Sequence, residues 1–438
     1  MTPRGSKPSH TPPTVSGTVR DLGYGGDGAV ETEHGIVLVP GALPGEAVRI
    51  ALTGRRRGVQ RGRLVSVVAS APDRVAPTCR LQARCGGCPL MIWSDAAQQE
   101  QKRAWVAAAV TAGVAEGKTP PGIGIAAGSD SLGYRRRARL HFHVTGVRRS
   151  MGYQEPRSNR VLDVAGCPVL SEPLAQALGV VRARLLPELA ANGEVELGLG
   201  AAGKVVLHLM CEEPQPASVY ACLRALVAED RLAGASLRLT GGPTEERIGD
   251  PRAYFPAVME GEVPLWGATG GFGQANDSVN RELVAWVVEA AAPQALNVLE
   301  LYAGHGNFTV PLARTAASLT AIEHHREAAE ACRANLAAAG IRTAKVVAAE
   351  VRPLPKRLGR GRVDVVVLDP PRTGAREVIP DIVGLRPGTI VYVSCDPPTL
   401  RRDLATLLQS GYAVDRAQGF DMFPHTAHVE TAVRLRPA

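Results

Sequence analysis

The chain has 438 residues, 45% of them hydrophobic, and a formal net charge of +8. This length exceeds one ordinary domain, and we expect about two to four domains. No apolar stretch approaches the roughly 20 residues that a membrane helix needs. No hydrophobic segment follows the polar N-terminus, as it would in a secretory signal. We therefore expect a soluble, cytoplasmic protein with no membrane partner.

The positive charge is concentrated in one part of the chain. Between Tyr134 and Arg160 there are eight arginines and one acidic residue, Glu155, so this segment alone contributes +7. An arginine-rich composition, with 44 Arg against 6 Lys, is the plain alternative explanation. Because the excess is clustered, we favour a nucleic acid as the partner.

Residues 14–71 alternate short β-like runs with glycine turns and show no helical period. Five short strands in a segment of about 55 residues predict a small OB-like barrel. We expect this barrel to bind RNA through arginines at its rim. These arginines are Arg55, Arg56, Arg57, Arg61 and Arg63.

Four of the eight cysteines have the spacing of a metal site. Cys79, Cys85 and Cys88 form a C-x5-C-x2-C pattern, and Cys167 is the natural fourth ligand. Four thiolates can hold zinc or a [4Fe-4S] cluster, and the spacing alone does not decide between them.

Changes in the sequence pattern along the chain suggest two further domain boundaries. We predict that residues 72–92 and 126–264 form a mixed α/β central domain around the cysteines. Residues 93–125 contain a helix from Ser94 to Val114, which we expect to pack on the C-terminal domain.

From about Val279 onward, strands alternate with amphipathic helices. The strands are ALNVLELY, LTAIE, VDVVVLDPP and TIVYVSC. This alternation predicts a doubly wound parallel sheet within residues 265–438. Ligands of such sheets bind beyond the carboxyl ends of the strands, so we expect the functional residues directly after each strand.

The loop after the first of these strands has the features of a cofactor site. Gly304 and Gly306 allow close approach of the backbone to a ligand, but Thr309 stands where the dinucleotide fingerprint needs a third glycine. Glu323 lies 19 residues after Gly304, where a carboxylate can accept both hydroxyls of a ribose. The pattern indicates a nucleoside cofactor without a pyrophosphate, unless the glycines serve only tight packing.

Three side chains near the strand ends are candidates for the chemistry. Cys395 follows TIVYVSC and can act as a nucleophile, although a lone cysteine can also be a buried thiol. Asp369 in LDPPRTG can bind the edge of a base or cap a helix. Glu430 lies in an apolar setting, which suits a carboxylate that abstracts a proton.

The motifs LYAGHGNFT, LDPPRTG, YVSCDPPTLRRDL and MFPHTAHVE together resemble the RNA uridine-5 methyltransferases, in the order and near the spacing of that family. The resemblance extends from Gly17 to Glu430. The chain is most similar to the branch of this family that has an N-terminal TRAM domain, an iron–sulfur cluster and a C-terminal class I methyltransferase domain. Departures include Asp396 where Asn is usual.

The resemblance implies that Cys395 adds to carbon 6 of uracil and that Glu430 removes the proton from carbon 5. S-adenosylmethionine would donate the methyl group. We expect His425 and His428 to be structural. The implied cofactor-binding residues are Gln274, Tyr302, Gly304, Asn307, Glu323, Glu350 and Asp369.

The resemblance also favours a structural [4Fe-4S] cluster over zinc, 23S ribosomal RNA over transfer RNA as the substrate, and a monomeric protein. Three alternatives stay open: a tRNA uridine-5 methyltransferase, a non-catalytic RNA-binding protein that retains the scaffold, and a cytosine methyltransferase. The presence of Cys395, Glu430 and the glycine loop argues against a non-catalytic RNA-binding protein. The FPHTAHVE ending resembles the uridine enzymes rather than the cytosine enzymes.

Overall fold

A computed structural model describes the chain except for residues 1–13, 57, 243–244, 259–262, 269 and 355–361. Arg57, one of the predicted rim arginines, lies outside the described residues. The chain divides into two compact units. The first comprises Met1–Ala83, Gly87–Gln101 and His425–Ala427, and the second comprises Arg84–Gly86, Lys102–Pro424 and His428–Ala438.

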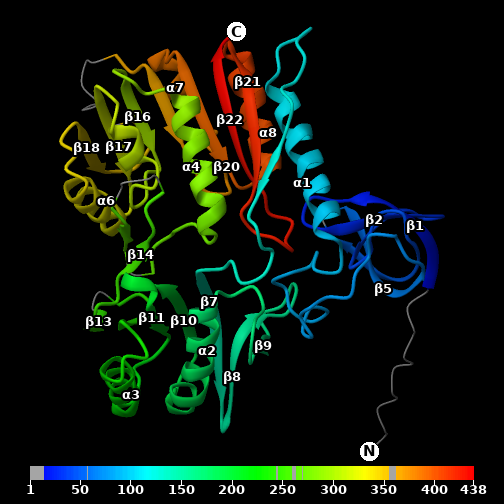
Figure 1. Cartoon of the computed structure of the whole chain (residues 1–438). Helices are drawn as coiled ribbons and strands as arrows, with labels where there is room; N and C mark the ends of the chain where they lie inside the picture. The colour runs from blue at the N-terminus through cyan, green and yellow to red at the C-terminus, as the bar shows by residue number, and fades with distance from the viewer. Residues whose placement is uncertain (1–13, 57, 243–244, 259–262, 269, 355–361) are drawn as a thin grey trace, which may run out of the picture. The chain divides into compact units, whose positions relative to one another are not determined.

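The first unit contains a closed five-stranded barrel, drawn in blue in Figure 1. Inward-facing valines and isoleucine fill it, among them Val30, Val37, Val39 and Ile50, each with no exposed surface. Alternation of these apolar residues with polar ones is what closes the sheet around one core, and the predicted barrel is confirmed. The strands, in the spatial order β1-β2-β3-β5-β4, are β1 Thr14–Leu22, β2 Asp27–Thr32, β3 Gly35–Pro40, β4 Ala47–Arg56 and β5 Val59–Ala69.

Helix α1 spans Asp95–Val110, followed by the 3-10 turn η1, Thr111–Gly113. The Ala97 amide donates to Ser94 Oγ at 3.3 Å, so Ser94 caps the helix as predicted. No helix of the described residues is long and apolar enough to cross a membrane.

A seven-stranded sheet forms the middle of the second unit, in the order β13-β12-β11-β10-β7-β8-β9. Leucines and valines from one face of this sheet pack beneath helices α2 and α3. The elements are β7 Arg137–Thr145, β8 Arg148–Gln154, β9 Val161–Asp163, α2 Glu172–Arg184, η2 Leu186–Glu188, β10 Gly193–Leu199, η3 Ala201–Gly203, β11 Val205–Cys211, α3 Ala217–Ala228, β12 Gly234–Leu239 and β13 Glu245–Gly249. A short hairpin, β14 Ala253–Phe255 and β15 Leu265–Gly267, follows.

The C-terminal part of the second unit is an eight-stranded sheet in the order β18-β17-β16-β19-β20-β22-β21-β6. The first five strands in this order pair in parallel with one another, and β22 is antiparallel to both β20 and β21. The doubly wound sheet is therefore confirmed. Its elements are β6 Ile125–Ala127, α4 Asp277–Ala291, β16 Asn297–Leu301, α5 Thr309–Ala313, β17 Ser318–Glu323, α6 Arg326–Ala338, β18 Ala344–Ala348, β19 Val365–Leu368, α7 Ile379–Leu385, β20 Thr389–Ser394, α8 Pro397–Gln409, β21 Tyr412–Asp421 and β22 Glu430–Pro437.

Strand β6 differs from the prediction, which ended the 93–125 segment just before residue 126. Ile125 and Ala127 pair with Gly419 and Asp421, so this strand extends the edge of the C-terminal sheet in parallel with β21. The backbone N–H and C=O groups of the segment form hydrogen bonds at that edge of the sheet. A three-residue strand is too short to show a hydrophobic period in the sequence.

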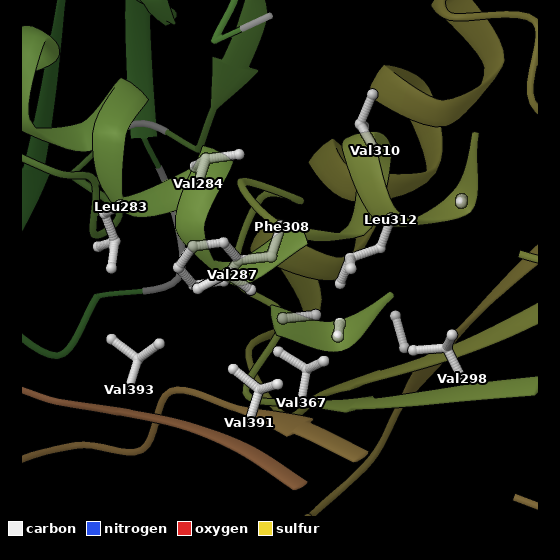
Figure 2. Close-up of a cluster of buried hydrophobic side chains, with 14 of the residues drawn as sticks. Leu283, Val284, Val287, Val298, Phe308, Val310, Leu312, Val367, Val391 and Val393 are labelled. Atoms are coloured by element: carbon white, nitrogen blue, oxygen red, sulfur yellow. The ribbon is translucent and has the colours of Figure 1, made fainter. Parts of the chain in front are cut away.

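Both faces of the C-terminal sheet are buried, because successive strand residues point to opposite sides. Figure 2 shows one side, where Leu283, Val284 and Val287 of α4 lie above Val367 and Val391. The opposite side chains of the same strands join a second core with α7 and α8. The chain moves from β16 outward to β17 and β18, and later continues through β19 and β20 on the other side. The carboxyl ends of β16 and β19 therefore flank a topological switch point, where such folds bind ligands.

Candidate active site

The glycine loop after β16 has a backbone that turns through left-handed conformations. Tyr302, Gly304 and Gly306 all have left-handed φ values, of 63°, 56° and 99°. A Cβ at Gly306 would lie 3.0 Å from the sulfur of Cys332, which leaves no room for a side chain. The loop thus turns tightly from strand to helix and leaves backbone groups facing the end of the sheet.

Glu323, at the end of β17, faces this loop. Its carboxylate accepts a hydrogen bond from the Gly304 amide at 2.9 Å and another from the His325 amide at 2.7 Å. It is buried, with 6% of its surface exposed. The structure therefore brings together the glycine and the acid that the sequence placed 19 residues apart.

Three further predicted cofactor-binding residues differ in their surroundings. The Asn307 and Asn280 side-chain amides exchange two hydrogen bonds, of 2.9 and 3.0 Å. Gln274 is buried, and its Oε1 has no hydrogen-bond partner among the described residues. Glu350 is exposed beyond the end of β18. Asn280 was missed by the sequence reasoning, although a polar residue on the apolar face of α4 was a signal.

Asp369 follows β19 and begins a loop that two buried side chains hold in place. Asp403 Oδ2 accepts bonds from the Tyr392 hydroxyl and the Ala375 amide, both at 2.8 Å. Tyr392 is fully buried, and so is Asp403. Gly374 has a φ of 78° with Asp403 against it, so the loop cannot shift easily. Tyr392 and Asp403 therefore hold the Gly374–Ala375 part of the loop that begins with Asp369.

The pairing of β20 with β22 places the thiol beside the predicted base. Ser394 pairs with Thr431 in an antiparallel register, so the next position of each strand brings Cys395 opposite Glu430. Asp396 then caps α8, because its Oδ1 accepts from the Thr399 amide at 2.9 Å. An aspartate serves this cap as well as the usual asparagine does.

Burial controls the protonation of these groups. Burial, together with the negative charges of Glu430 and Asp369, raises the pKa of the Cys395 thiol to about 12, and the positive charge of Arg372 opposes this rise. Burial also raises the pKa of both Asp369 and Glu430, and the negative charge of Asp369 adds to the effect on Glu430. The two carboxyl groups interact, so they do not ionise independently. A carboxyl group with a raised pKa is a stronger base than an ordinary carboxylate when it is ionised, which suits Glu430 to proton abstraction.

Arg372, in the loop that begins with Asp369, supplies positive charge at this site. It lowers the pKa of both Cys395 and Glu430. Its Nη2 lies 3.1 Å from Nε2 of His428.

A buried acid that sequence reasoning missed lies behind the site. Glu300 in β16 is 1% exposed, and burial raises its pKa to about 8, with Asp369 and Glu323 contributing in the same direction and Thr309 opposing it. In the sequence, Glu300 lies within the largely apolar strand NVLEL and gives no sign of a functional role. Only the fold shows that it lies near the acidic side chains of Asp369 and Glu323.

The four predicted metal-binding cysteines are divided between the units. Cys79 and Cys88 belong to the first unit, and Cys85 and Cys167 belong to the second. Within the second unit, burial raises the pKa of Tyr153, and the thiols of Cys167 and Cys85 contribute. Among the described residues, no three His, Cys, Asp or Glu side chains form a group that could hold a metal ion. The cluster therefore stays a prediction.

The doubly wound domain, with a glycine loop after its first strand and a buried carboxylate bonded to that loop, has the fold of an S-adenosylmethionine-dependent methyltransferase. Residues 262–437 match the family described as tRNA (Uracil-5-)-methyltransferase. A 23S rRNA (uracil(1939)-C(5))-methyltransferase of Chromohalobacter salexigens is 34% identical, and the match covers 99% of this chain and 91% of that protein. The enzyme of the same description from Methylococcus capsulatus is 33% identical over 95% of this chain and 96% of its own length.

The chain belongs to the RNA uracil-C5 methyltransferase family and is an enzyme of that class. The crystal structure of Pyrococcus abyssi tRNA (uracil-54, C5)-methyltransferase in complex with S-adenosyl-L-homocysteine has the same fold. Its TM-score is 0.73 at 22% identity, and the match covers 96% of this chain and 100% of that one.

Proposed function

We propose that this enzyme methylates carbon 5 of a uridine in 23S ribosomal RNA through a covalent bond to Cys395. The observation that carries the mechanism is the register of β20 and β22, which places the thiol of Cys395 next to the carboxyl of Glu430. The substrate is inferred from relatives described as 23S rRNA enzymes, which match this chain over more than nine-tenths of both lengths.

S-adenosylmethionine fits the glycine loop and supplies an electrophilic methyl group when bound. The cradle at Gly306, which a Cβ would fill, admits close backbone approach, and Glu323 offers its carboxylate to ribose hydroxyls. Gln274 offers a buried Oε1 that the described residues do not use. Tyr302, Asn307, Asp369 and the exposed Glu350 complete the proposed contacts.

The reacting residues act in sequence on the uracil ring. Carbon 5 of uracil is a weak nucleophile, so the thiolate of Cys395 adds to carbon 6 and turns the ring into an enolate that takes the methyl group at carbon 5. Arg372 stabilises the negative charges of this step, since it already lowers the pKa of the thiol. Glu430 then removes the carbon 5 proton, after which the thiolate leaves. Asp369 is placed to bind the edge of the base. The uridine is flipped out of its stack to reach these groups.

We also propose a structural [4Fe-4S] cluster on Cys79, Cys85, Cys88 and Cys167. Four thiols are the donor set that such a cluster or zinc requires, and all four are half-buried rather than core residues. The proposed cluster is tested on protein purified without oxygen. Its iron and sulfide contents are measured, and its absorption spectrum is recorded. About four irons per chain support the cluster, and one zinc contradicts it.

The barrel is proposed to be a TRAM domain that binds RNA, and the enzyme to act as a cytoplasmic monomer. Exposed Arg55, Arg56 and Arg63 on the β4–β5 hairpin supply positive charge for a phosphate backbone. A salt titration of RNA binding by the full chain and by an R55A/R56A/R63A variant measures their part.

The experiment that tests the function is nucleoside mass spectrometry on unmodified ribosomal and transfer RNA after incubation with S-adenosylmethionine. New 5-methyluridine in 23S RNA supports the proposal. 5-Methyluridine in transfer RNA alone, 5-methylcytidine, or no methylated base supports one of the three alternatives. Cys395→Ala is expected to abolish the product, and Cys222→Ala, which alters a half-buried thiol of the seven-stranded-sheet domain, serves as the matched control.

A further inference from the structure

We propose that His428 is a positioning residue: its neutral ring accepts a hydrogen bond from Arg372 and holds that guanidinium toward Cys395 and Glu430. The inference rests on the proposed function. It goes beyond the expectation from sequence that His428 is structural.

The hydrogen bond itself fixes the protonation state of the ring. Arg372 Nη2 lies 3.1 Å from His428 Nε2. A guanidinium has donors and no acceptor, so Nε2 must accept and carries no proton. Burial lowers the pKa of His428 to about 4, and the charges of Arg372, Lys102 and Arg135 act in the same direction against Asp396. The ring is therefore a neutral acceptor at neutral pH.

The ring of His428 is itself held by its surroundings. Phe423 packs against it edge to face, with ring centroids 6.1 Å apart and planes at 78°. The Arg135 guanidinium lies 5.7 Å from the centre of the Phe423 ring. Lys102 Nζ, which is fully buried, donates to the Phe423 carbonyl at 3.1 Å and to Asp421 at 2.6 Å. These contacts fix the segment between β21 and β22 that carries His428.

Arg372 needs such a partner because its own side chain is exposed. A long exposed arginine samples many rotamers, and its electrostatic effect on a buried group depends on where its charge lies. Cys395 faces Glu430, Asp369 and Asp396, all of which raise the pKa of its thiol, whereas Arg372 lowers it. An acceptor that limits Arg372 to one orientation thus favours the thiolate. Releasing Arg372 raises the pKa of the thiol and moves thiolate formation to higher pH.

The test uses a 23S RNA fragment with 5-fluorouridine at the modified position, together with S-adenosylmethionine. Cys395 bonds to carbon 6 and the methyl group is added at carbon 5, but fluorine cannot leave as a cation. The complex therefore accumulates and resists denaturation. Its rate of formation is measured against pH for the wild type, His428→Ala and His428→Gln. Gln is the conservative variant, because its side-chain oxygen can accept from Arg372.

We expect His428→Ala to slow formation of the complex roughly 100-fold, the cost of misplacing a group by about 1 Å, and to move the alkaline rise of the profile to higher pH. His428→Gln should recover most of the rate. In an Arg372→Ala background, His428→Ala should have little further effect, since the histidine acts through the arginine.

Three results would overturn the inference. The first is a wild-type rate and pH profile for His428→Ala. The second is an equal loss in the Ala and Gln variants with lowered unfolding temperatures, which would assign the histidine to packing. The third is full additivity of the two substitutions in the double variant. If the wild type itself forms no complex, the proposed function fails, and this inference fails with it.

Discussion

Replacing Glu300 by Gln tests the account of the buried acidic group behind the site. Glu300 is 1% exposed in the middle of the sheet, and its pKa is raised from 4.5 to about 8, mainly by burial. The folded protein therefore keeps this proton at neutral pH, whereas the unfolded chain loses it. Gln has nearly the same shape and cannot ionise.

The size of the effect follows from linkage. Between the unfolded pKa of 4.5 and the folded pKa of about 8, the folded state binds more protons than the unfolded state, so its stability falls as the pH rises. At pH 7 the unfolded group lies about 2.5 pH units above its pKa, and each unit corresponds to 1.36 kcal/mol. Glu300 thus costs about 3 kcal/mol at pH 7 and almost nothing near pH 4.5.

The assay is urea unfolding of cofactor-free wild-type and Glu300→Gln protein at about pH 5 and about pH 8. We expect the variant to gain stability relative to the wild type by about 3 kcal/mol between these conditions. Glu330→Gln, at an exposed position of α6 paired with Arg326, is the matched control and should show no such gain. A difference between Glu300→Gln and the wild type that is independent of pH, or that shrinks as pH rises, would refute the reasoning.

Three other substitutions probe the packing and the cofactor site. Lys102→Met leaves Asp421 as a buried, unpaired charge and should lower the free energy of unfolding by about 3–5 kcal/mol, measured in urea; a loss below about 1 kcal/mol would contradict this. Asn280→Ala removes both bonds to Asn307 and should weaken S-adenosylmethionine binding roughly tenfold by calorimetry, so an unchanged affinity would exclude this support. Gly306→Ala should abolish cofactor binding, because its φ is 99° and Cys332 occupies the space, and wild-type affinity would show that the loop is not the site.

Much of the fold could be predicted because its signals are local. The period of two in the barrel strands and the alternation of strands and helices after Val279 both depend on neighbouring residues in the chain. Strand β18, Ala344–Ala348, was missed because AKVVA carries too few residues to mark a strand. Strand β6 was missed for a similar reason, since its place at the sheet edge is set by pairing with β21.

The site residues, too, are predictable from the sequence only where their signals are local. The motifs pointed to Cys395 and the glycine loop, which each follow a recognisable strand, and to Glu430 at the end of the FPHTAHVE segment. Their juxtaposition could not be read from the sequence, because it depends on the antiparallel insertion of β22 beside β20. Asn280 and His428 contact residues 27 and 56 positions away in the chain, and no local pattern indicates such distant partners.

The most direct test of the central claim is peptide mapping of Glu430→Gln after incubation with S-adenosylmethionine and a 23S RNA fragment. Without the base, the proton on carbon 5 stays in place, and release should slow by roughly 10²–10⁴-fold. The account predicts that a methylated uridine accumulates, bonded to the sulfur of Cys395. Release of free 5-methyluridine at the wild-type rate, or an adduct on a different residue, would contradict it.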